Sequence, residues 1–214
     1  MQYQLGRKPS PFDPRDYELV NYIPKLKLSL VKTKQWEFPL AALDQGQTGH
    51  CVGFGSADWG INLPIEDTFT NADGDKIYYA CKVVDGEPLQ EDGSCVRSAA
   101  KVLQSMGRLQ TYAFAATTKE ITYWLLHNGP VLVGTNWTND MFTPDVNNVI
   151  HATGASAGGH CYLLNGVPDC KHYHLQNSWS ETWGINGGAL ISIKDFAKLL
   201  RSGGEAMAAV ELPL

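Results

Sequence analysis

The stretch that decides the fold runs from Asp44 to Gly55 and reads DQGQTGHCVGFG. A glycine-rich loop leads here into a segment with apolar residues at helical spacing, which predicts a helix from Cys51 to Leu63. A thiol at the start of a helix lies beside the free N–H groups of the first turn, whose partial positive charge favours the thiolate. Cys51 is therefore a candidate nucleophile, although a free cysteine is more often a small buried hydrophobic residue.

The partners of a catalytic thiol meet it in space rather than in sequence. Gln45 precedes Cys51 by six residues, so its carboxamide and the backbone N–H of Cys51 would supply the two donors of an oxyanion hole. His160 is the candidate base because it follows two glycines and opens a predicted strand. The alternative for His160 is an ordinary hydrogen-bonded strand histidine.

Asn177 follows His160 by 17 residues and ends another predicted strand. A hairpin would bring the Asn177 side-chain oxygen to one ring nitrogen of His160, which fixes the tautomer and leaves the other nitrogen free to face sulfur. Trp179 and Trp183 would shield this bond from water and so strengthen it. The alternative is a turn asparagine beside two core tryptophans.

The composition fits one large domain or two packed lobes, with 214 residues, 43% hydrophobic and 18% charged. A formal charge of -5 and a pI near 5.6 offer no basic patch for nucleic acid, so a peptide or protein substrate is the expected partner. The N-terminus lacks a signal-peptide pattern and no apolar run reaches membrane-spanning length. We expect a cytoplasmic or virion-associated location without membrane contact.

The pattern along the chain changes from helical to extended. Prolines punctuate residues 1–35 and predict an irregular lead-in, and helices are expected at 96–106 and from Thr117 to about 128. The predicted strands are 131–135, 160–167, 172–176, 189–193 and 207–212. This order predicts an α+β fold in which a mainly helical lobe (36–127) packs against an antiparallel sheet lobe (128–214), with the active site in the cleft between them.

The motifs resemble those of the papain-like C1 cysteine peptidases, particularly compact bacterial members and their phage relatives. The segments that carry the resemblance, in chain order, are 12–17, 44–51, 91–97, 129–133, 158–160 and 177–188. The resemblance implies that Cys51 attacks a peptide carbonyl, forming an acyl-enzyme, and that His160 transfers the proton. It implies that Asn177 orients His160 and that Gln45 completes the oxyanion hole. No cofactor or metal is implied.

Two further positions are candidate substrate-binding residues. Gly93 matches the family's glycine that pairs with the substrate backbone, and Trp179 belongs to the Asn-Ser-Trp motif. The specificity pockets of the family cannot be carried over, because the 109 and 126 residues that separate Cys51 from His160 and Asn177 fall below the roughly 130–150 usual in papain and cathepsins.

The surroundings of Cys51 depart from the family signature Cys-Gly-Ser/Ala-Cys-aromatic, since residues 48–52 read TGHCV. Thr48 replaces a cysteine that forms a family disulfide, and His50 and Val52 flank the thiol with unusual side chains. No long helical segment precedes the domain, so activation by removal of a propeptide is not expected. We still expect the Cys51 thiol to have a pKa below the ordinary value of about 8.5, through the helix and an imidazolium.

Three functions remain open. The first is a peptidase, the second a catalytically silent papain-like structural or binding module, for instance in a phage particle, and the third a cysteine amidase of cell-wall peptides. Gln45 and the Asn-Ser-Trp motif at 177–179 favour the first over the third. Cys170, His172 and His174 alternate along one strand, but without a fourth ligand they do not predict a zinc site. Because Cys81 and Cys95 lie outside the catalytic segments, neither is expected to be needed for activity.

Overall fold

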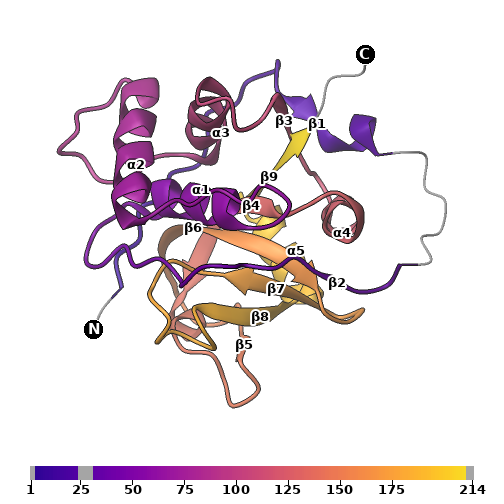
Figure 1. Cartoon of the computed structure of the whole chain (residues 1–214). Helices are drawn as coiled ribbons and strands as arrows, with labels where there is room; N and C mark the ends of the chain where they lie inside the picture. Colours follow the sequence, from indigo (N-terminus) through magenta and orange to yellow (C-terminus); the bar gives the residue numbers. More distant parts are fainter. Residues whose placement is uncertain (1–2, 24–30, 211–214) are drawn as a thin grey trace.

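The computed structural model describes residues 3–23 and 31–210 (Figure 1). The helices are α1 (Cys51–Ile61), α2 (Asn71–Asp85), α3 (Val96–Ser105), α4 (Thr118–His127) and α5 (Ile193–Arg201), with short 3-10 helices η1 (Leu19–Tyr22) and η2 (Asn139–Phe142). The strands are β1 (Tyr17–Glu18), β2 (Lys34–Gln35), β3 (Thr111–Phe114), β4 (Val131–Thr138), β5 (Val149–Ile150), β6 (Ser156–Val167), β7 (His172–Gln176), β8 (Gly188–Ser192) and β9 (Glu205–Val210). In Figure 1, α1, α2 and α3 gather in the upper left part, and β5, β7 and β8 lie below α1.

The strands form one sheet in the order β1-β3-β9-β4-β6-β7-β8-β5, and β2 also pairs with β6. Most pairings are antiparallel, but β1 with β3 and β5 with β8 are parallel, so the sheet is mixed. The predicted α+β fold is thus confirmed, with parallel pairs at both sheet ends. The β6 strand lies at the centre, paired to β4, β7 and β2, and this position fixes the residues it carries.

Local sequence signals explain the helices that were predicted. The α1 helix begins at Cys51 as predicted and ends at Ile61, two residues early, and all its residues are buried. At the start of α4 the Thr117 hydroxyl accepts a hydrogen bond from the N–H of Glu120, the expected N-cap. Gly107, after α3, has the positive φ of 70° that favours glycine after a helix end.

The elements that were not predicted include α2, α5 and β3, besides the short strands β1, β2 and β5 and the two 3-10 helices. The α2 helix has a capping box between Thr70 and Asp73 and a left-handed Gly86 at its C-terminus, signals that the sequence contained. The α5 helix begins after Ser192, whose hydroxyl accepts from the N–H of Asp195. The third, β3, is a short strand paired with β9. The last two residues of the predicted strand 207–212 lie outside the described residues, and the predicted boundaries at 35 and 127 stay predictions.

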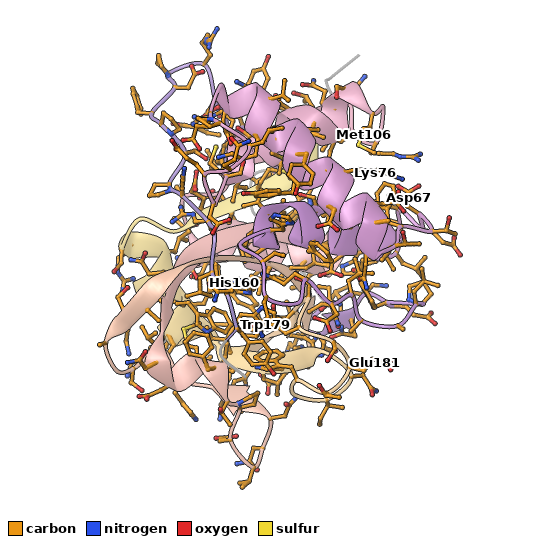
Figure 2. The ribbon with its side chains drawn as sticks, turned by 90° about the vertical axis from the view of Figure 1, so that its left-hand side faces the viewer. Asp67, Lys76, Met106, His160, Trp179 and Glu181 are labelled. Atoms are coloured by element: carbon orange, nitrogen blue, oxygen red, sulfur yellow. The ribbon has the colours of Figure 1, made fainter. Side chains whose placement is uncertain are left out.

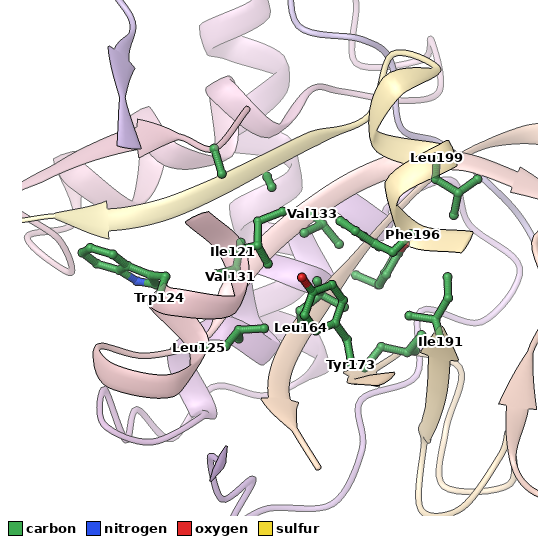
Figure 3. Packing of buried hydrophobic residues seen from close by; sticks show 14 of the residues in the cluster. Ile121, Trp124, Leu125, Val131, Val133, Leu164, Tyr173, Ile191, Phe196 and Leu199 are labelled. Carbon is green, nitrogen blue, oxygen red and sulfur yellow. The ribbon is translucent and has the colours of Figure 1, made fainter. Parts of the chain in front are cut away.

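Two hydrophobic cores lie on the two faces of the sheet. The first packs α4 and α5 against β4, β6, β7 and β8, with Leu164, Tyr173 and Phe196 at its centre (Figure 3). The second packs α1 and α3 against the other face and includes Leu132 and Cys161. Burial of each large side chain stabilises the fold by about 1.5–3 kcal/mol. The second core therefore holds α1 firmly on β6, and the first core fixes β6 from the opposite face.

Candidate active site

The Cys51 thiol lies at the N-terminus of α1, where that helix packs on β6. It is fully buried, and backbone groups of Cys161, Gly6 and Val52 hydrogen-bond to it. Cys161 directly follows His160 on β6. The contact with Cys161 therefore brings the thiol against the strand that carries the predicted base.

The His160 ring is held between an amide and aromatic rings. Its Nε2 donates to the Oδ1 of Asn177 over 2.8 Å, while its Nδ1 has no partner within the described residues. The ring stacks on Trp179 at a centroid distance of 4.5 Å (Figure 2). It also meets the edge of Trp137 at 4.9 Å. The Asn177 contact thus selects the tautomer whose Nδ1 carries the lone pair.

The pairing of β6 with β7 explains how Asn177 reaches His160. The two strands are antiparallel, and Leu163 lies opposite Gln176, the last residue of β7. The chain therefore leaves β7 in the direction of the end of β6 that carries His160. The Oδ1 of Asn177 also accepts from the N–H of Ser178 over 2.9 Å, which orients the amide. The side chain is therefore fixed by the backbone N–H of Ser178 as well as by the histidine.

Gln45 is buried and tied to the same region. Its backbone N–H donates to the carbonyl of Ser178 over 3.0 Å, and its Oε1 accepts from the Ser178 hydroxyl over 3.3 Å. Its Nε2 donates to the carbonyl of Thr48 over 2.7 Å and to that of Gln4 over 3.2 Å. One donor of Gln45 therefore already binds a peptide carbonyl of the chain's own N-terminal region.

The N-terminal segment, residues 3–10, covers the thiol. The ring of Tyr3 stacks on Trp179 at 4.3 Å, and the N–H of Arg7 donates to the carbonyl of Gly159 over 2.9 Å. Between them lies Gly6, where a Cβ would stand 1.8 Å from the carbonyl oxygen of Gly49. No other residue fits there without movement, so the predicted irregular lead-in is a closely fitted cover.

This cover changes the electrostatics expected from the sequence. Burial raises the pKa of the Cys51 thiol to about 11, and its backbone hydrogen bonds and the nearby Arg7 charge oppose that shift only in part. Burial likewise lowers the pKa of His160 to about 4, against the smaller opposite effect of the bond to Asn177. The expected low thiol pKa is therefore wrong for this arrangement, since desolvation outweighs the helix and leaves both groups neutral at pH 7.

The unusual neighbour His50 is engaged elsewhere. Its ring stacks on Tyr78 at 3.8 Å, and its Nδ1 bonds to the carboxylate of Asp75 over 2.7 Å. Both partners belong to α2. His50 thus fastens the loop before Cys51 to the neighbouring helix.

Of the two predicted substrate-binding residues, Trp179 is buried between His160 and Tyr3. Gly93 has its N–H on the hydroxyl of Tyr78 (2.9 Å) and its carbonyl on the ammonium of Lys82 (3.0 Å). It is the next residue, Ser94, that pairs with the N-terminal segment. The roles of Gly93 and Trp179 in substrate binding stay predictions.

Sequence reasoning missed Ser94 and the N-terminal segment, because their contacts are made by backbone groups. The five cysteines, all within the described residues, are free, and only Cys170 is exposed. No group of three His, Cys, Asp or Glu side chains in the described ranges is arranged to hold a metal ion. Among the described helices none is long and apolar enough to cross a membrane.

Comparison with models of protein families identifies the family of the chain. A family model described as papain family cysteine protease matches residues 65–198. The chain belongs to the papain family. The matched stretch contains His160 and Asn177 and begins after Gln45 and Cys51.

Two papain-family relatives are similar over part of the chain. Cathepsin B-like cysteine proteinase 5 of Caenorhabditis elegans is 30% identical over 82 residues, which are 36% of this chain and 23% of that protein. Cathepsin B of Dictyostelium discoideum is 34% identical over 77 residues, 33% of this chain and 24% of that protein. The similarity thus spans about a quarter of each relative.

Solved structures show the papain-like fold over the whole chain. Xylellain, a cysteine protease from Xylella fastidiosa, has a TM-score of 0.70 at 15% identity and covers 99% of both chains. The procathepsin B S9 of Trypanosoma congolense has a TM-score of 0.63 at 11% identity, covering 98% of this chain and 87% of that one. The digestive procathepsin L 3 of Tenebrio molitor has a TM-score of 0.52 at 15% identity, covering 98% and 75%.

Proposed function

We propose that this chain is a cysteine peptidase that hydrolyses peptide bonds of a protein or peptide through an acyl-enzyme. The observation that carries the proposal is the hydrogen bond of the Cys51 thiol to the backbone of Cys161, the residue after His160. The His160 Nδ1 is unpartnered within the described residues, and its Nε2 is bound to Asn177. A thiol at a helix start, packed against the strand that carries an imidazole with one fixed and one unpartnered nitrogen, fits nucleophilic catalysis.

The chemistry follows from these groups. His160 takes the proton of the Cys51 thiol, and the thiolate attacks the carbonyl carbon of the scissile peptide bond. His160 then gives the proton to the leaving amine, and a thioester with Cys51 remains. Water, deprotonated by His160, attacks the thioester, which releases the acid product and restores the thiol. Asn177 keeps the ring oriented in every step.

The oxyanion of both steps needs two donors. The backbone N–H of Cys51 lies in the first turn of α1, and the carboxamide of Gln45 is the second candidate donor. A substrate would take the place of the Gln4 carbonyl on Gln45. The segment that now occupies this donor must therefore leave before a substrate binds.

The alternative of a silent structural or binding module, such as a virion component, has one observation in its favour. Cys51 has no exposed surface, and its pKa is raised to about 11. A permanently closed cleft would make the same residues inert. The decisive question is whether the N-terminal segment opens in solution.

The experiment measures release of a fluorophore from a set of peptidyl amides under reducing conditions, with wild type and Cys51→Ala. We expect turnover by the wild type alone, and a thioester on Cys51 detectable by mass spectrometry when a slowly deacylating peptidyl ester is used. Cys170→Ala, which removes the exposed thiol, is the control and keeps full activity. If no amide is cleaved and isolated cell-wall peptides are, the amidase alternative holds, and if neither is cleaved, the module alternative holds.

A further inference from the structure

Two thiols meet where α1 packs on β6. Cys51 and Cys161 are both fully buried, and both belong to the second hydrophobic core. The backbone of Cys161 hydrogen-bonds to the Cys51 thiol, so the Cys51 sulfur lies directly against the residue that carries the second thiol. The proposed peptide hydrolysis gives the side chain of Cys161 no role.

The side chain of Cys161 points toward α1. A Cβ on Gly55 would stand 3.3 Å from the Cys161 Sγ and 3.2 Å from a methyl group of Leu132. Gly55 follows Cys51 by four residues, a spacing that places two residues on the same helix face with Cβ positions about 5–6 Å apart. Because Gly55 has no side chain, α1 approaches β6 closely. A disulfide requires such an approach, since its two Cβ atoms stand about 3.5–4.5 Å apart.

The two thiols also act on each other's ionisation. Burial is the main cause that raises the pKa of the Cys161 thiol, and Cys51 is the next, ahead of Cys81, the third thiol of this core. The remaining thiols are held elsewhere: Cys95 forms a hydrogen bond with a serine hydroxyl of α3 over 3.2 Å, and Cys170 is exposed between β6 and β7. Cys161 is therefore the thiol best placed to react with Cys51.

We propose that Cys161 is a resolving cysteine, which traps peroxide-oxidised Cys51 as an intramolecular disulfide. Once the N-terminal segment has left, the Cys51 thiolate displaces hydroxide from hydrogen peroxide and becomes a sulfenic acid. The Cys161 sulfur then attacks the sulfur of this acid. The S–S bond forms as the S–O bond breaks, and the hydroxide leaves with the Cys161 proton as water. Two thiols and one peroxide thus give one disulfide and two water molecules.

The disulfide keeps the oxidation reversible. Peroxide converts an unprotected sulfenic acid further to sulfinic acid, which thiol reductants do not reverse, whereas reduction of a disulfide restores both thiols. The N-terminal segment decides when this chemistry runs, because Cys51 has no exposed surface while the segment is in place. The disulfide is therefore a reversible inactive state of the uncovered site.

The test uses the full chain with Cys170→Ala, which removes the exposed thiol, and Gly6→Ala, which places a Cβ against the Gly49 carbonyl and displaces the N-terminal segment. Hydrogen peroxide is raised until Cys51 no longer reacts with iodoacetamide, and the products are mapped by mass spectrometry without reduction. We expect a Cys51–Cys161 cross-link with the loss of two hydrogen atoms. Dithiothreitol should then restore the alkylation of Cys51.

Variants of the second thiol provide the comparison, and circular dichroism checks that each is folded. Cys161→Ala should abolish the cross-link and divert Cys51 to sulfinic acid, so that the fraction recovered by dithiothreitol falls at least about tenfold. Cys161→Ser, which is closer in volume, should behave in the same way. Cys81→Ala removes the other thiol of the same core and is the matched control, which should keep the cross-link.

Sulfenic or sulfinic acid on Cys51 without the cross-link would overturn the proposal, as would a disulfide of Cys51 with Cys81. Recovery that survives Cys161→Ala would overturn it too, and so would a Cys51 thiol that peroxide never oxidises. No step of the test requires turnover, so its outcome is separate from the peptidase proposal. Cross-linking without amide hydrolysis upholds the resolving cysteine alone, and hydrolysis without cross-linking upholds the peptidase alone.

Discussion

The elements that carry Cys51 and His160, named the walls below, and the N-terminal segment that covers the thiol, named the cover, are held by different forces. Cys51 and His160 lie on α1 and β6, which the second hydrophobic core holds against each other, while the first core buries the opposite face of β6. The N-terminal segment is held by backbone hydrogen bonds and by two ion pairs, of Arg7 with Glu205 and of Lys8 with Glu87. Its Tyr3 and Leu5 side chains are only partly buried where they pack against the first core. The walls are therefore fixed by full apolar burial, while the cover depends mainly on polar contacts, supported by two partly buried apolar side chains. We infer that reactivity is decided by the cover, because the walls keep the same geometry whether it is present or not.

The largest expected effect comes from removing the candidate base on the walls. Replacing His160→Ala should lower kcat/KM for a peptide amide by about 10³-fold or more, since both the base and the general acid are lost. The control is His174→Ala on β7, a partly buried histidine whose pKa is also lowered to about 4 and which bonds to Asn165 over 2.7 Å. Its activity should stay within about twofold of wild type. Equal losses in the two variants would show that the walls matter only for folding.

The next effect separates orientation from proton transfer. Asn177→Ala should lower kcat by about 10²-fold with little change in KM, because the ring loses its orientation but the base remains. The rate of Cys51 alkylation by iodoacetamide should fall much less than kcat. Asn165→Ala, which removes the matching amide partner of His174, is the control. An unchanged kcat in Asn177→Ala would contradict the orienting role.

A third change acts on the cover alone. Gly6→Ala places a Cβ against the Gly49 carbonyl, and we expect Cys51 in this variant to be alkylated at least about tenfold faster at pH 7. The reaction is followed by mass spectrometry in a Cys170→Ala chain, because the exposed Cys170 would otherwise react first. Gln4→Ala removes an exposed side chain from the same segment and should leave the rate unchanged. If Gly6→Ala is no faster, the cover does not limit access to the thiol.

The pH dependence of Cys51 alkylation tests whether the cover raises the pKa of the thiol. With the pKa of Cys51 raised to about 11, only about one thiol in 10⁴ is ionised at pH 7, and the alkylation rate should rise with pH up to about 11. When the cover is displaced by Gly6→Ala, the thiol regains water and the pKa falls, so the rate should level off at a lower pH. The rate of iodoacetamide labelling from pH 5 to 10 measures both profiles. Identical profiles would mean that burial by the segment is not the cause of the raised pKa.

The smallest expected effect concerns Cys81 and Cys95, which belong neither to the catalytic positions nor to the N-terminal segment. Cys81→Ser and Cys95→Ser together should change turnover per folded molecule by less than about twofold, since both side chains are buried away from the cleft. Circular dichroism checks that the fold is kept while amide hydrolysis is measured. Lost turnover in a folded double variant would place a needed thiol outside the Cys51 site.

The sequence predicted the walls well because their signals are local. Cys51 stands at a loop-to-helix boundary and Thr117 at a cap, and the strand of residues 172–176 has the bounds of β7. The missed α2 also had local signals, the capping box at Thr70 and the C-terminal Gly86, which were not used. The N-terminal segment could not be predicted in the same way. Its bonds join residues 4–8 to positions as distant as 45, 94 and 159, and its prolines indicate only the absence of a helix.

The thiol pKa was missed for the same reason. A helix start and a neighbouring imidazole are visible in the sequence near Cys51 and His160, whereas desolvation depends on which remote segment covers them. The sequence therefore defines the reactive groups, and the long-range fit of Gly6 and Arg7 defines their state in this arrangement.

The close fit of Gly6 has a genetic consequence. Every missense change of one nucleotide in a glycine codon introduces a side chain, and any side chain there begins with a Cβ that would stand 1.8 Å from the Gly49 carbonyl. All such point mutations should thus displace the segment, whatever amino acid they encode. Variants whose Cys51 is no longer covered would arise from a single nucleotide change at this codon. A selection for gain of activity in a randomised gene should therefore return substitutions at position 6 repeatedly.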